Sequence, residues 1–503
     1  MAKTYLVNGQ VYIGRAFENK TLCMEEGKLT VLEAGCDTAD GTVFDAAGLK
    51  VVPGFIDTHS HGAVGVDVNG ATAEDLEKIS CFMASKGTTS WLCSVLTDTQ
   101  EQTEWCIEQF KAHKVMEQNG AELAGIHLEG PFLAKEYKGA MPEHLLKKND
   151  IPLVKRYQEL AEGNIRYITI SPELEGVQDM IPTLKELGIV VGIGHSGATY
   201  DEAMSAIAQG ATVGTHVGNA SRLFHQHEPA IFGAIMESDV YCETICDGRH
   251  LVPGSVRMYA KCKGLDRIVA ITDSIMAAGL PDGNYHLGVN DVVVIDGDAK
   301  LASNGTRAGS TLTQDVALKN MLKWLPNTLE EILPTLSENP AKEMNLWDRK
   351  GSIETGKDAD LVLLDEDAGV FMVSDSNDLM EENPDVIPFS DVTGCRVDID
   401  ENHNEETRTD KDGNKKIGHY IVKSSTVSGG YPNVKLEGLD TFEMTDTVLD
   451  GKNVGQNVSI TAGSTFTMHS GTIQNTPGSN VYLNEKAEFI MHSGTITGSK
   501  GNI

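Results

Sequence analysis

From about residue 51 onward, the chain alternates short apolar runs with amphipathic segments of helical length. Eight apolar runs precede residue 273: residues 51–56, 88–95, 124–128, 166–170, 189–193, 211–215, 240–245 and 267–272. Between them, residues 73–85, 102–117, 177–187 and 200–209 have the periodicity of helices. Eight strand–helix repeats predict an α/β protein built on a (β/α)8 TIM barrel, and a doubly wound sheet is the alternative at the level of fold.

The segments on both sides of these repeats have a different pattern. The first fifty residues read as short strands separated by Gly and Asn turns. Residues 351–364 form a turn-rich stretch that ends in an apolar strand. We therefore expect residues 1–50 and 351–367 to form one small β-sandwich domain drawn from both flanks, with the barrel at residues 51–350.

The last part of the chain changes character again. Residues 368–412 are rich in Asp, Glu and Asn and lack apolar periodicity, which predicts an acidic linker. Beyond it, the stretch Phe-Thr-Met-His-Ser-Gly-Thr-Ile at Phe466 recurs as Phe-Ile-Met-His-Ser-Gly-Thr-Ile at Phe489, an offset of 489 − 466 = 23 residues. Residues 413–503 are thus predicted to be a β-rich, solenoid-like extension.

Composition narrows the classes of function. The chain has 503 residues and a net charge of −32, which argues against binding the nucleic-acid backbone. Nine cysteines without a CxxC pair fit reduced thiols. We find no apolar stretch long enough to span a membrane and no signal-peptide pattern at the N-terminus. We expect a cytoplasmic protein without nucleic-acid or membrane partners.

Side chains that suit metal binding follow five of the eight apolar runs. They are His59 and His61 after the first run, Glu129 after the third, His195 after the fifth, His216 after the sixth and Asp273 after the eighth. In a barrel the carboxyl ends of all strands meet at one mouth. A lone histidine there is more often structural, but six such residues at one end predict a site for a divalent metal such as zinc or iron.

The spacing of the first pair supports this interpretation. Side chains alternate along a strand, so the His-x-His of His59 and His61 points both rings to the same face and lets them hold one ion. His113, His144 and His286 do not follow an apolar run and are interpreted as structural residues.

Six motifs in residues 1–366 resemble those of the N-acetylglucosamine-6-phosphate deacetylases of the amidohydrolase superfamily. They are Pro-Gly-Phe-Ile-Asp-x-His-x-His-Gly, His-Leu-Glu-Gly-Pro-Phe, Gly-His-Ser, Thr-His-x-x-Asn-Ala, Thr-Asp-Ser and Gly-x-Ile-x-x-Gly-x-x-Ala-Asp-Leu-Val. The resemblance implies a barrel with a small β-domain and a homodimer. It implies one or two divalent metal ions per subunit, with zinc as the expected metal and iron as the alternative. It also implies deacetylation of N-acetylglucosamine 6-phosphate to glucosamine 6-phosphate and acetate, in amino-sugar catabolism.

The resemblance also implies roles for individual residues. Glu129, His195 and His216 would be the metal ligands, and Asp273 the catalytic acid and base. Substrate contacts would come from Ala140, Asn219, Ala220, His227, His250, Arg307, Ala308 and Gly309, with His250 reaching into the neighbouring subunit.

Two positions depart from the family pattern. Met141 follows Lys-Gly-Ala where relatives often have His or Gln, and His227 precedes Glu-Pro where an arginine usually helps to bind phosphate. The alternative substrates are therefore another N-acetylated sugar or an N-acyl amino acid. From a different class, the alternative is a surface or glycan-binding protein that acts through the C-terminal repeats.

Overall fold

The computed structural model describes residues 3–365 and, beyond them, twelve strands, of which β21 (Val370–Ser374) is the first and the others lie between residues 419 and 497. Contacts divide the chain into two compact units, residues 1–383 and 384–503, and each is described here by itself.

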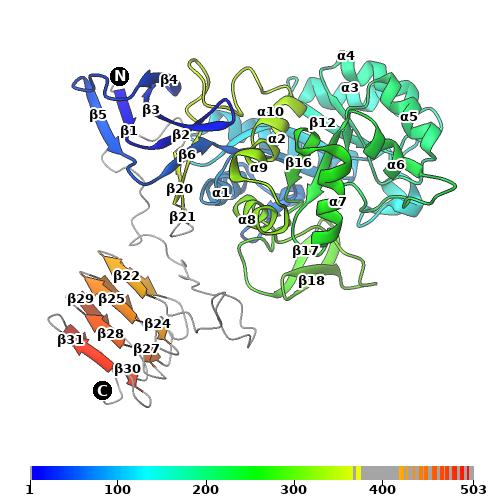
Figure 1. The fold of residues 1–503 in the computed structure, drawn as a ribbon. Coiled ribbons are helices and arrows are strands. Elements are labelled where there is room, and N and C mark those ends of the chain that lie inside the picture. The colour runs from blue at the N-terminus through cyan, green and yellow to red at the C-terminus, as the bar shows by residue number, and fades with distance from the viewer. Residues whose placement is uncertain are drawn as a thin grey trace. The chain divides into compact units, whose positions relative to one another are not determined.

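Eight parallel strands form the centre of the first unit (Figure 1). They are β7 (Phe55–Ser60), β10 (Thr88–Leu96), β11 (Glu122–Glu129), β12 (Ile165–Ile170), β13 (Val190–Ile193), β14 (Val213–Gly214), β15 (Tyr241–Ile245) and β16 (Ile268–Ile271), paired in this order. The last strand returns to the first, because the amide of Asp273 donates to His59 O (2.9 Å) and that of His61 to Ser274 O (2.7 Å). The predicted barrel is confirmed, and a strand lies in each of the eight apolar runs.

Helices follow the strands, and most of them cover the outside of the barrel. They are α1 (Ala73–Ala84), α2 (Gln100–Val115), α3 (Ile151–Leu160), α4 (Ile181–Glu186), α5 (Tyr200–Gln209), α6 (Ala230–Glu237), α7 (Pro253–Lys263), α8 (Gln314–Trp324), α9 (Leu329–Ile332) and α10 (Glu338–Glu343). Short 3-10 turns are η1 (Val68–Gly70), η2 (Lys135–Tyr137), η3 (Glu143–Leu145), η4 (Gln178–Met180), η5 (Leu265–Arg267) and η6 (Leu333–Thr335).

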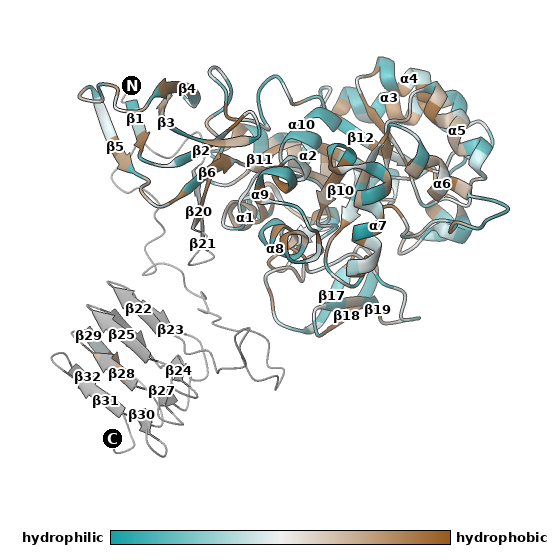
Figure 2. Ribbon diagram, viewed as in Figure 1, coloured by the Kyte–Doolittle hydropathy of each residue, from teal (hydrophilic) through white to brown (hydrophobic). Residues whose placement is uncertain are grey.

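Local signals explain where two of these helices begin. Thr72 caps α1 and Thr199 caps α5, and in each case an acid three residues later, Asp75 or Glu202, completes a capping box. In Figure 2 the barrel strands are largely hydrophobic, whereas the surrounding helices carry both hydrophilic and hydrophobic residues. Amphipathic helices of this kind bury their apolar side against the strands.

The end of the barrel at which the strands begin is closed by apolar side chains. Ala341 of α10 and Met344, which follows it, pack with Ile56, Leu92 and Tyr167 inside the barrel. Because this end is filled, the opposite end, where the strands have their carboxyl termini, remains for a functional site.

The small β-domain is built from both flanks of the barrel. Its strands are β1 (Lys3–Val7), β2 (Gln10–Ile13), β3 (Ala16–Glu25), β4 (Lys28–Glu33), β5 (Gly41–Asp45), β6 (Lys50–Pro53), β20 (Leu361–Asp365) and β21. β20 runs antiparallel to β6, and β21 runs antiparallel to β20. The predicted contribution from both ends is thus confirmed. β21, however, lies inside residues 368–412, which were predicted as linker, so that boundary was placed too early.

Two small elements near the mouth were not predicted. A three-stranded antiparallel sheet of β17 (Gly283–Leu287), β18 (Asn290–Ile295) and β19 (Asp298–Leu301) follows the last barrel strand. The hairpin of β8 (Gly62–Ala63) and β9 (Val66–Asp67) follows β7, the first barrel strand. Among the described residues, no helix is long and apolar enough to cross a membrane.

The second unit is described through its strands. They are β22 (His419–Lys423), β23 (Thr426–Ser428), β24 (Val434–Leu436), β25 (Thr441–Thr445), β26 (Thr447–Asp450), β27 (Gln456–Ile460), β28 (Thr465–Met468), β29 (Gly471–Gln474), β30 (Ser479–Leu483), β31 (Glu488–Met491) and β32 (Thr495–Thr497). They form three parallel sheets, in which Phe466 pairs with Phe489 and Met468 with Met491. These strand pairs have the 23-residue offset of the sequence repeat, and the solenoid-like extension remains a prediction. The rest of the predicted linker, residues 375–412, lies outside the described residues.

Candidate metal centre

The six predicted metal-site residues meet at the carboxyl ends of the barrel strands. His59 and His61 lie at the end of β7, Glu129 is the last residue of β11, and His195, His216 and Asp273 follow β13, β14 and β16 by two residues. All six are buried, and Asp273 is the most exposed of them at 8%.

Three of these residues have backbone conformations that L-amino acids rarely adopt. The φ angles of His195, His216 and Asp273 are +48°, +26° and +49°. Such conformations cost about 1–3 kcal/mol each and persist where the surrounding structure enforces them, which is common at functional sites. Here they turn the chain inward directly after a strand, so that each side chain points over the barrel.

One group of side chains consists of Glu129, His195 and His216. Glu129 Oε1 lies 3.0 Å from His195 Nε2 and 3.1 Å from His216 Nε2, and the two Nε2 atoms are 3.1 Å apart. Three ligand atoms of one carboxylate and two imidazoles at such distances can hold one divalent ion. An ion held by only these three side chains would have a coordination position left for water or substrate.

A second group shares Glu129 with the first. His59 Nε2 and His61 Nε2 are 3.2 Å apart, and they lie 3.5 Å from Glu129 Oε1 and 3.3 Å from Glu129 Oε2. Asp273 Oδ1 is 3.3 Å from His61 Nε2 and 3.7 Å from His59 Nε2. The carboxylate of Glu129 therefore connects two adjacent candidate metal positions, with Asp273 beside the second.

The far sides of the histidine rings are held in a way that suits metal ligation. His61 Nδ1 lies 3.0 Å from Ser94 O, and His195 Nδ1 lies 2.7 Å from Tyr137 O. A carbonyl oxygen only accepts, so each Nδ1 carries the proton and leaves the Nε2 lone pair directed at the centre. The residues thus fit a divalent metal.

The electrostatics keep both acids ionised. Burial opposes ionisation of Glu129, but the electrostatic attraction and hydrogen bonds of His195 and the hydrogen bonds of His216 and His59 hold its pKa well below the usual range. The pKa of Asp273 is also lowered: burial opposes this, but the hydrogen bond from His61 and the nearby charges of His59, His61 and His216 together outweigh burial. The pKa of His61 rises to about 9, against the effect of burial, through its hydrogen bonds to Asp273 and Glu129. A bound cation would displace the proton that these two acids draw to His61 Nε2.

Three of the predicted substrate residues lie directly against the metal-site residues. Asn219 Nδ2 donates to His216 O (3.1 Å), and Ala220 O accepts from the amide of Ser196, next to His195 (3.1 Å). A Cβ at Gly309 would lie 2.8 Å from Asp273 O, so no larger residue fits there without movement. The structure brings Asn219, Ala220 and Gly309 to the site, and their roles remain predictions.

The other predicted substrate residues make contacts of their own. His250 Nδ1 pairs with Asp247 (2.7 Å), and Arg307 Nε pairs with Asp298 (2.8 Å). Ala308 is buried, and its amide donates to Ala299 O (3.1 Å). His227 lies on an exposed loop. No hydrogen bond or ion pair within residues 3–365 links these four to the metal-site residues, so their contact with substrate remains a prediction.

The segment that contains Ala140 approaches the centre from another side. Ala140 O accepts from Asn290 Nδ2 (2.8 Å), and a Cβ at the preceding Gly139 would lie 3.1 Å from the ring of His195. Met141 is 2% exposed and packs with Leu287 and Val292. Met141 is therefore a core residue, which explains why an apolar side chain occupies this position.

Two buried residues of the centre were not predicted. Glu243, in the middle of β15, lies 3.3 Å from His59 Nδ1 through its Oε2 atom. His127 in β11 lies between Ser94 Oγ and Thr169 Oγ1 (2.9 Å each) and stacks on Tyr167. The signal for His127 was its position two residues before Glu129, on the same face of one strand.

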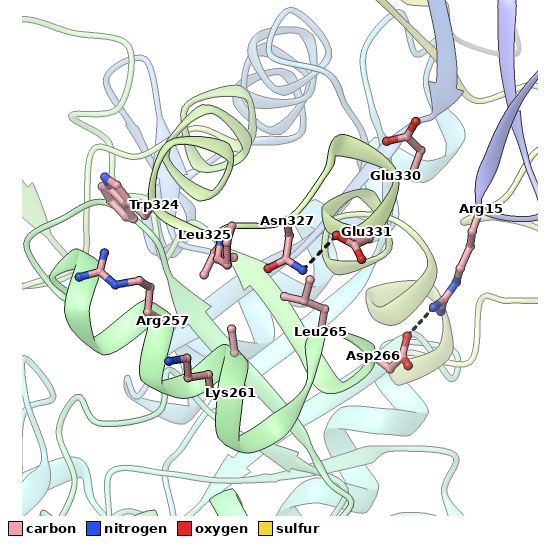
Figure 3. A pocket seen from close by; sticks show the side chains of 12 residues that line it. Arg15, Arg257, Lys261, Leu265, Asp266, Trp324, Leu325, Asn327, Glu330 and Glu331 are labelled. Atoms are coloured by element: carbon pink, nitrogen blue, oxygen red, sulfur yellow. Dashed lines mark hydrogen bonds and ion pairs between the residues drawn. The ribbon is translucent and has the colours of Figure 1, made fainter.

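A pocket of about 760 Å³ lies elsewhere, at the outer helices α7, α8 and α9 (Figure 3). Arg257 and Lys261 of α7 and Trp324 of α8 line one part of it, and the ion pair of Arg15 with Asp266 borders the other. None of the predicted site residues lines this pocket, so the chemistry belongs to the barrel mouth.

Comparisons with known proteins agree with this geometry. Residues 50–388 match the model of the amidohydrolase family. The N-acetylglucosamine-6-phosphate deacetylase of Lysinibacillus sphaericus is 35% identical over 350 residues, which are 69% of this chain and 90% of that protein. The enzyme of the same name from Bacillus subtilis is 36% identical over 64% of this chain and 82% of its own length.

A solved structure extends the similarity to three dimensions. The crystal structure of N-acetylglucosamine-6-phosphate deacetylase from Pasteurella multocida superimposes with a TM-score of 0.70 at 30% identity. The match covers 74% of this chain and 98% of that one.

Proposed function

This chain belongs to the amidohydrolase family and, within it, to the N-acetylglucosamine-6-phosphate deacetylases, and from this premise we propose that it hydrolyses the acetamide of N-acetylglucosamine 6-phosphate in amino-sugar catabolism. The products are glucosamine 6-phosphate and acetate. The observation that carries the proposal is Glu129, shared by two groups of imidazoles at the barrel mouth, with the ionised Asp273 beside it.

The proposed resident metal is zinc, which carboxylate and imidazole ligands suit, and iron is the second choice. Glu129, His195 and His216 would hold the essential ion, and His59 and His61 a second, weaker one. When bound, the metal lowers the pKa of water toward ~7 and polarises the acetyl carbonyl.

Asp273 is proposed as the catalytic acid and base. Its carboxylate is held at the mouth because its own backbone pairs with both neighbours: its amide donates to His59 O, and its carbonyl accepts from the amide of Ser310 (2.7 Å). The ionised carboxylate accepts a proton from the attacking water. It then delivers that proton to the sugar nitrogen, since an amine leaves readily only when it is protonated.

The substrate would be held by loops that frame this centre. Asn219 and Ala220, next to His216, are proposed to contact the sugar, as are Ala140, His250, Arg307, Ala308 and Gly309. His227 stands where an arginine is expected, so the phosphate must rely on other groups. Arg222, in the loop after Ala220, is the cationic residue nearest to His227 in sequence. We further propose a cytoplasmic homodimer in which His250 reaches the neighbouring site.

The test is a deacetylation assay on the purified, metal-loaded full chain. Acetate release is measured with N-acetylglucosamine 6-phosphate and with N-acetylglucosamine. We expect a higher kcat/KM for the phosphorylated sugar. If neither sugar is hydrolysed while an N-acyl amino acid is, the proposed substrate is wrong although the class of reaction is right.

A further inference from the structure

We infer that Glu243 is a positioning residue for the metal centre, which fixes one ligand of each candidate metal group through a single carboxylate oxygen. The inference rests on the metal centre of the proposed function. Glu243 lies in β15, is 0% exposed, and is not itself a member of either group of ligands.

Glu243 contacts the second group, which contains His59 and His61, through the imidazole ring of His59. Glu243 Oε2 lies 3.3 Å from His59 Nδ1, and a carboxylate can only accept, so His59 must carry its proton on Nδ1. The lone pair on His59 Nε2 then faces His61 and Glu129. A carboxylate behind a ligating imidazole fixes its tautomer and orientation and raises its basicity.

Glu243 contacts the first group, which contains His195 and His216, through the backbone of His216. The same Oε2 atom accepts from the amide of His216 (3.0 Å), and the carbonyl oxygen of Glu243 accepts from the amide of Val217 (3.0 Å). Glu243 therefore holds two successive peptide groups, one with its side chain and one with its main chain.

His216 needs this support more than the other histidines. His61 and His195 have carbonyl oxygens behind their Nδ1 atoms, but among the described residues the Nδ1 atom of His216 has no hydrogen-bond partner. The backbone of His216 is also in the left-handed region, at φ +26°. Its ring is thus placed through its backbone, in which Glu243 holds the amide and Asn219 the carbonyl.

Burial explains why a charged residue is required. A buried carboxylate is costly unless it is hydrogen-bonded, and here both bonds converge on ligands of the metal. Glu243→Gln keeps the shape and an amide oxygen that can still accept, but it removes the negative charge that raises the basicity of His59. Exchange of such a partner typically weakens metal affinity about 10–100-fold.

A matched control is available in the same barrel. Glu343, in α10, is also buried (3% exposed). Burial and the neighbouring negative charge of Glu243 raise its pKa well above the usual range, so it is a neutral acid of nearly the same shape as glutamine. No hydrogen bond or ion pair among residues 3–365 joins it to a metal ligand. Glu343→Gln therefore replaces a buried acid by an amide in the same barrel without removing a hydrogen bond to a metal ligand.

The experiment measures affinity for zinc by competition with a chelator, without substrate, on full-length wild type, Glu243→Gln and Glu343→Gln. The absorption spectrum of the cobalt-loaded proteins reports ligand geometry. We expect affinity to fall about 10–100-fold in Glu243→Gln, with an altered cobalt spectrum and a normal melting temperature. Glu343→Gln should stay within a few-fold of wild type.

Wild-type affinity and spectrum in Glu243→Gln would overturn the inference, and so would equal losses in both variants. If Glu243→Gln does not fold, Glu243→Asp replaces it: the charge remains, but the shorter side chain cannot reach both partners, and wild-type affinity would again overturn the inference. Because no substrate is present, absence of deacetylation in the wild type would refute the proposed function without affecting this result.

Discussion

Oδ1 of Asp273 lies 3.3 Å from Nε2 of His61, across the seam where the last strand of the barrel meets the first. The acid therefore stands beside the His59–His61 group rather than between His195 and His216. The carboxyl of Asp273 thus lies at the edge of the metal centre that the loop of Gly309 also borders.

The first prediction concerns this acid. Asp273→Asn should retain metal, because Glu129, His195 and His216 are unchanged, but lose about 10²–10⁴-fold in kcat, the usual contribution of positioned proton transfer. Turnover and metal content are measured on the same sample. The exposed Asp291→Asn in β18 is the control and should behave as wild type. Near-normal turnover of metal-loaded Asp273→Asn would refute the acid–base role.

A second prediction separates the two metal groups. His195→Ala should lose the essential ion and nearly all activity, since three protein ligands are the usual minimum of a catalytic site. His59→Ala should lower stoichiometry or affinity but leave measurable turnover. Elemental analysis after dialysis gives the metal content of each. Loss of activity in the opposite order would mean that the essential ion sits at His59 and His61.

A third prediction addresses the phosphate. His227→Arg should raise kcat/KM for the phosphorylated sugar about tenfold, because hydrogen bonds to charged groups contribute about 1.5–3 kcal/mol, and should leave the free sugar unaffected. His225→Arg, two residues earlier on the same exposed loop, controls for added charge. If both variants improve equally, general attraction of an anion explains the gain and position 227 has no special role.

The fourth prediction is a pH dependence of stability. Glu122 pairs with Lys350 (2.8 Å) and Arg349 (2.7 Å). Burial opposes its ionisation, but these two cations outweigh burial and lower its pKa from 4.5 to about 2. Because the folded-state pKa lies below the unfolded one, the stabilisation is complete above about pH 4.5 and is lost as the pH falls toward 2.

Glu122→Gln should therefore be less stable than wild type at pH 7, by about 1.5–3 kcal/mol, and the difference should shrink below pH 4.5. Urea unfolding of metal-free protein at pH 7 and pH 3.5 measures it. A difference that is the same at both pH values would show that the pair contributes through packing and not through charge.

The fifth prediction concerns the C-terminal part, which we expect to be dispensable for catalysis. A chain ended at residue 376 keeps β21 and should retain metal and turnover. A chain ended at residue 369 lacks β21 and exposes β20 as an open edge, so it should aggregate more while keeping its specific activity. A soluble, metal-loaded chain of residues 1–376 with little turnover would show that the tail takes part in the reaction.

The barrel could be predicted because strands buried on both faces read as continuous apolar runs. The meeting of the candidate metal residues could be predicted because parallel strands place their ends together, so that His59 and Asp273 lie close despite their distance in sequence. Glu243 could not: it interrupts an apolar run, and its partners His59 and His216 lie 184 and 27 residues away. The sheet of β17–β19 was missed because its strands are short and partly exposed.

The seam between β7 and β16 also sets the order of events during biosynthesis. The hydroxyl of Thr272 donates to the carbonyl of His59, 213 residues earlier, and the amide of Asp273 donates to the same carbonyl. A nascent chain cannot form this pairing until residue 273 has left the ribosome. The six candidate site residues therefore come together only late in synthesis, and a chain whose synthesis stops earlier has the histidines and Glu129 without Asp273.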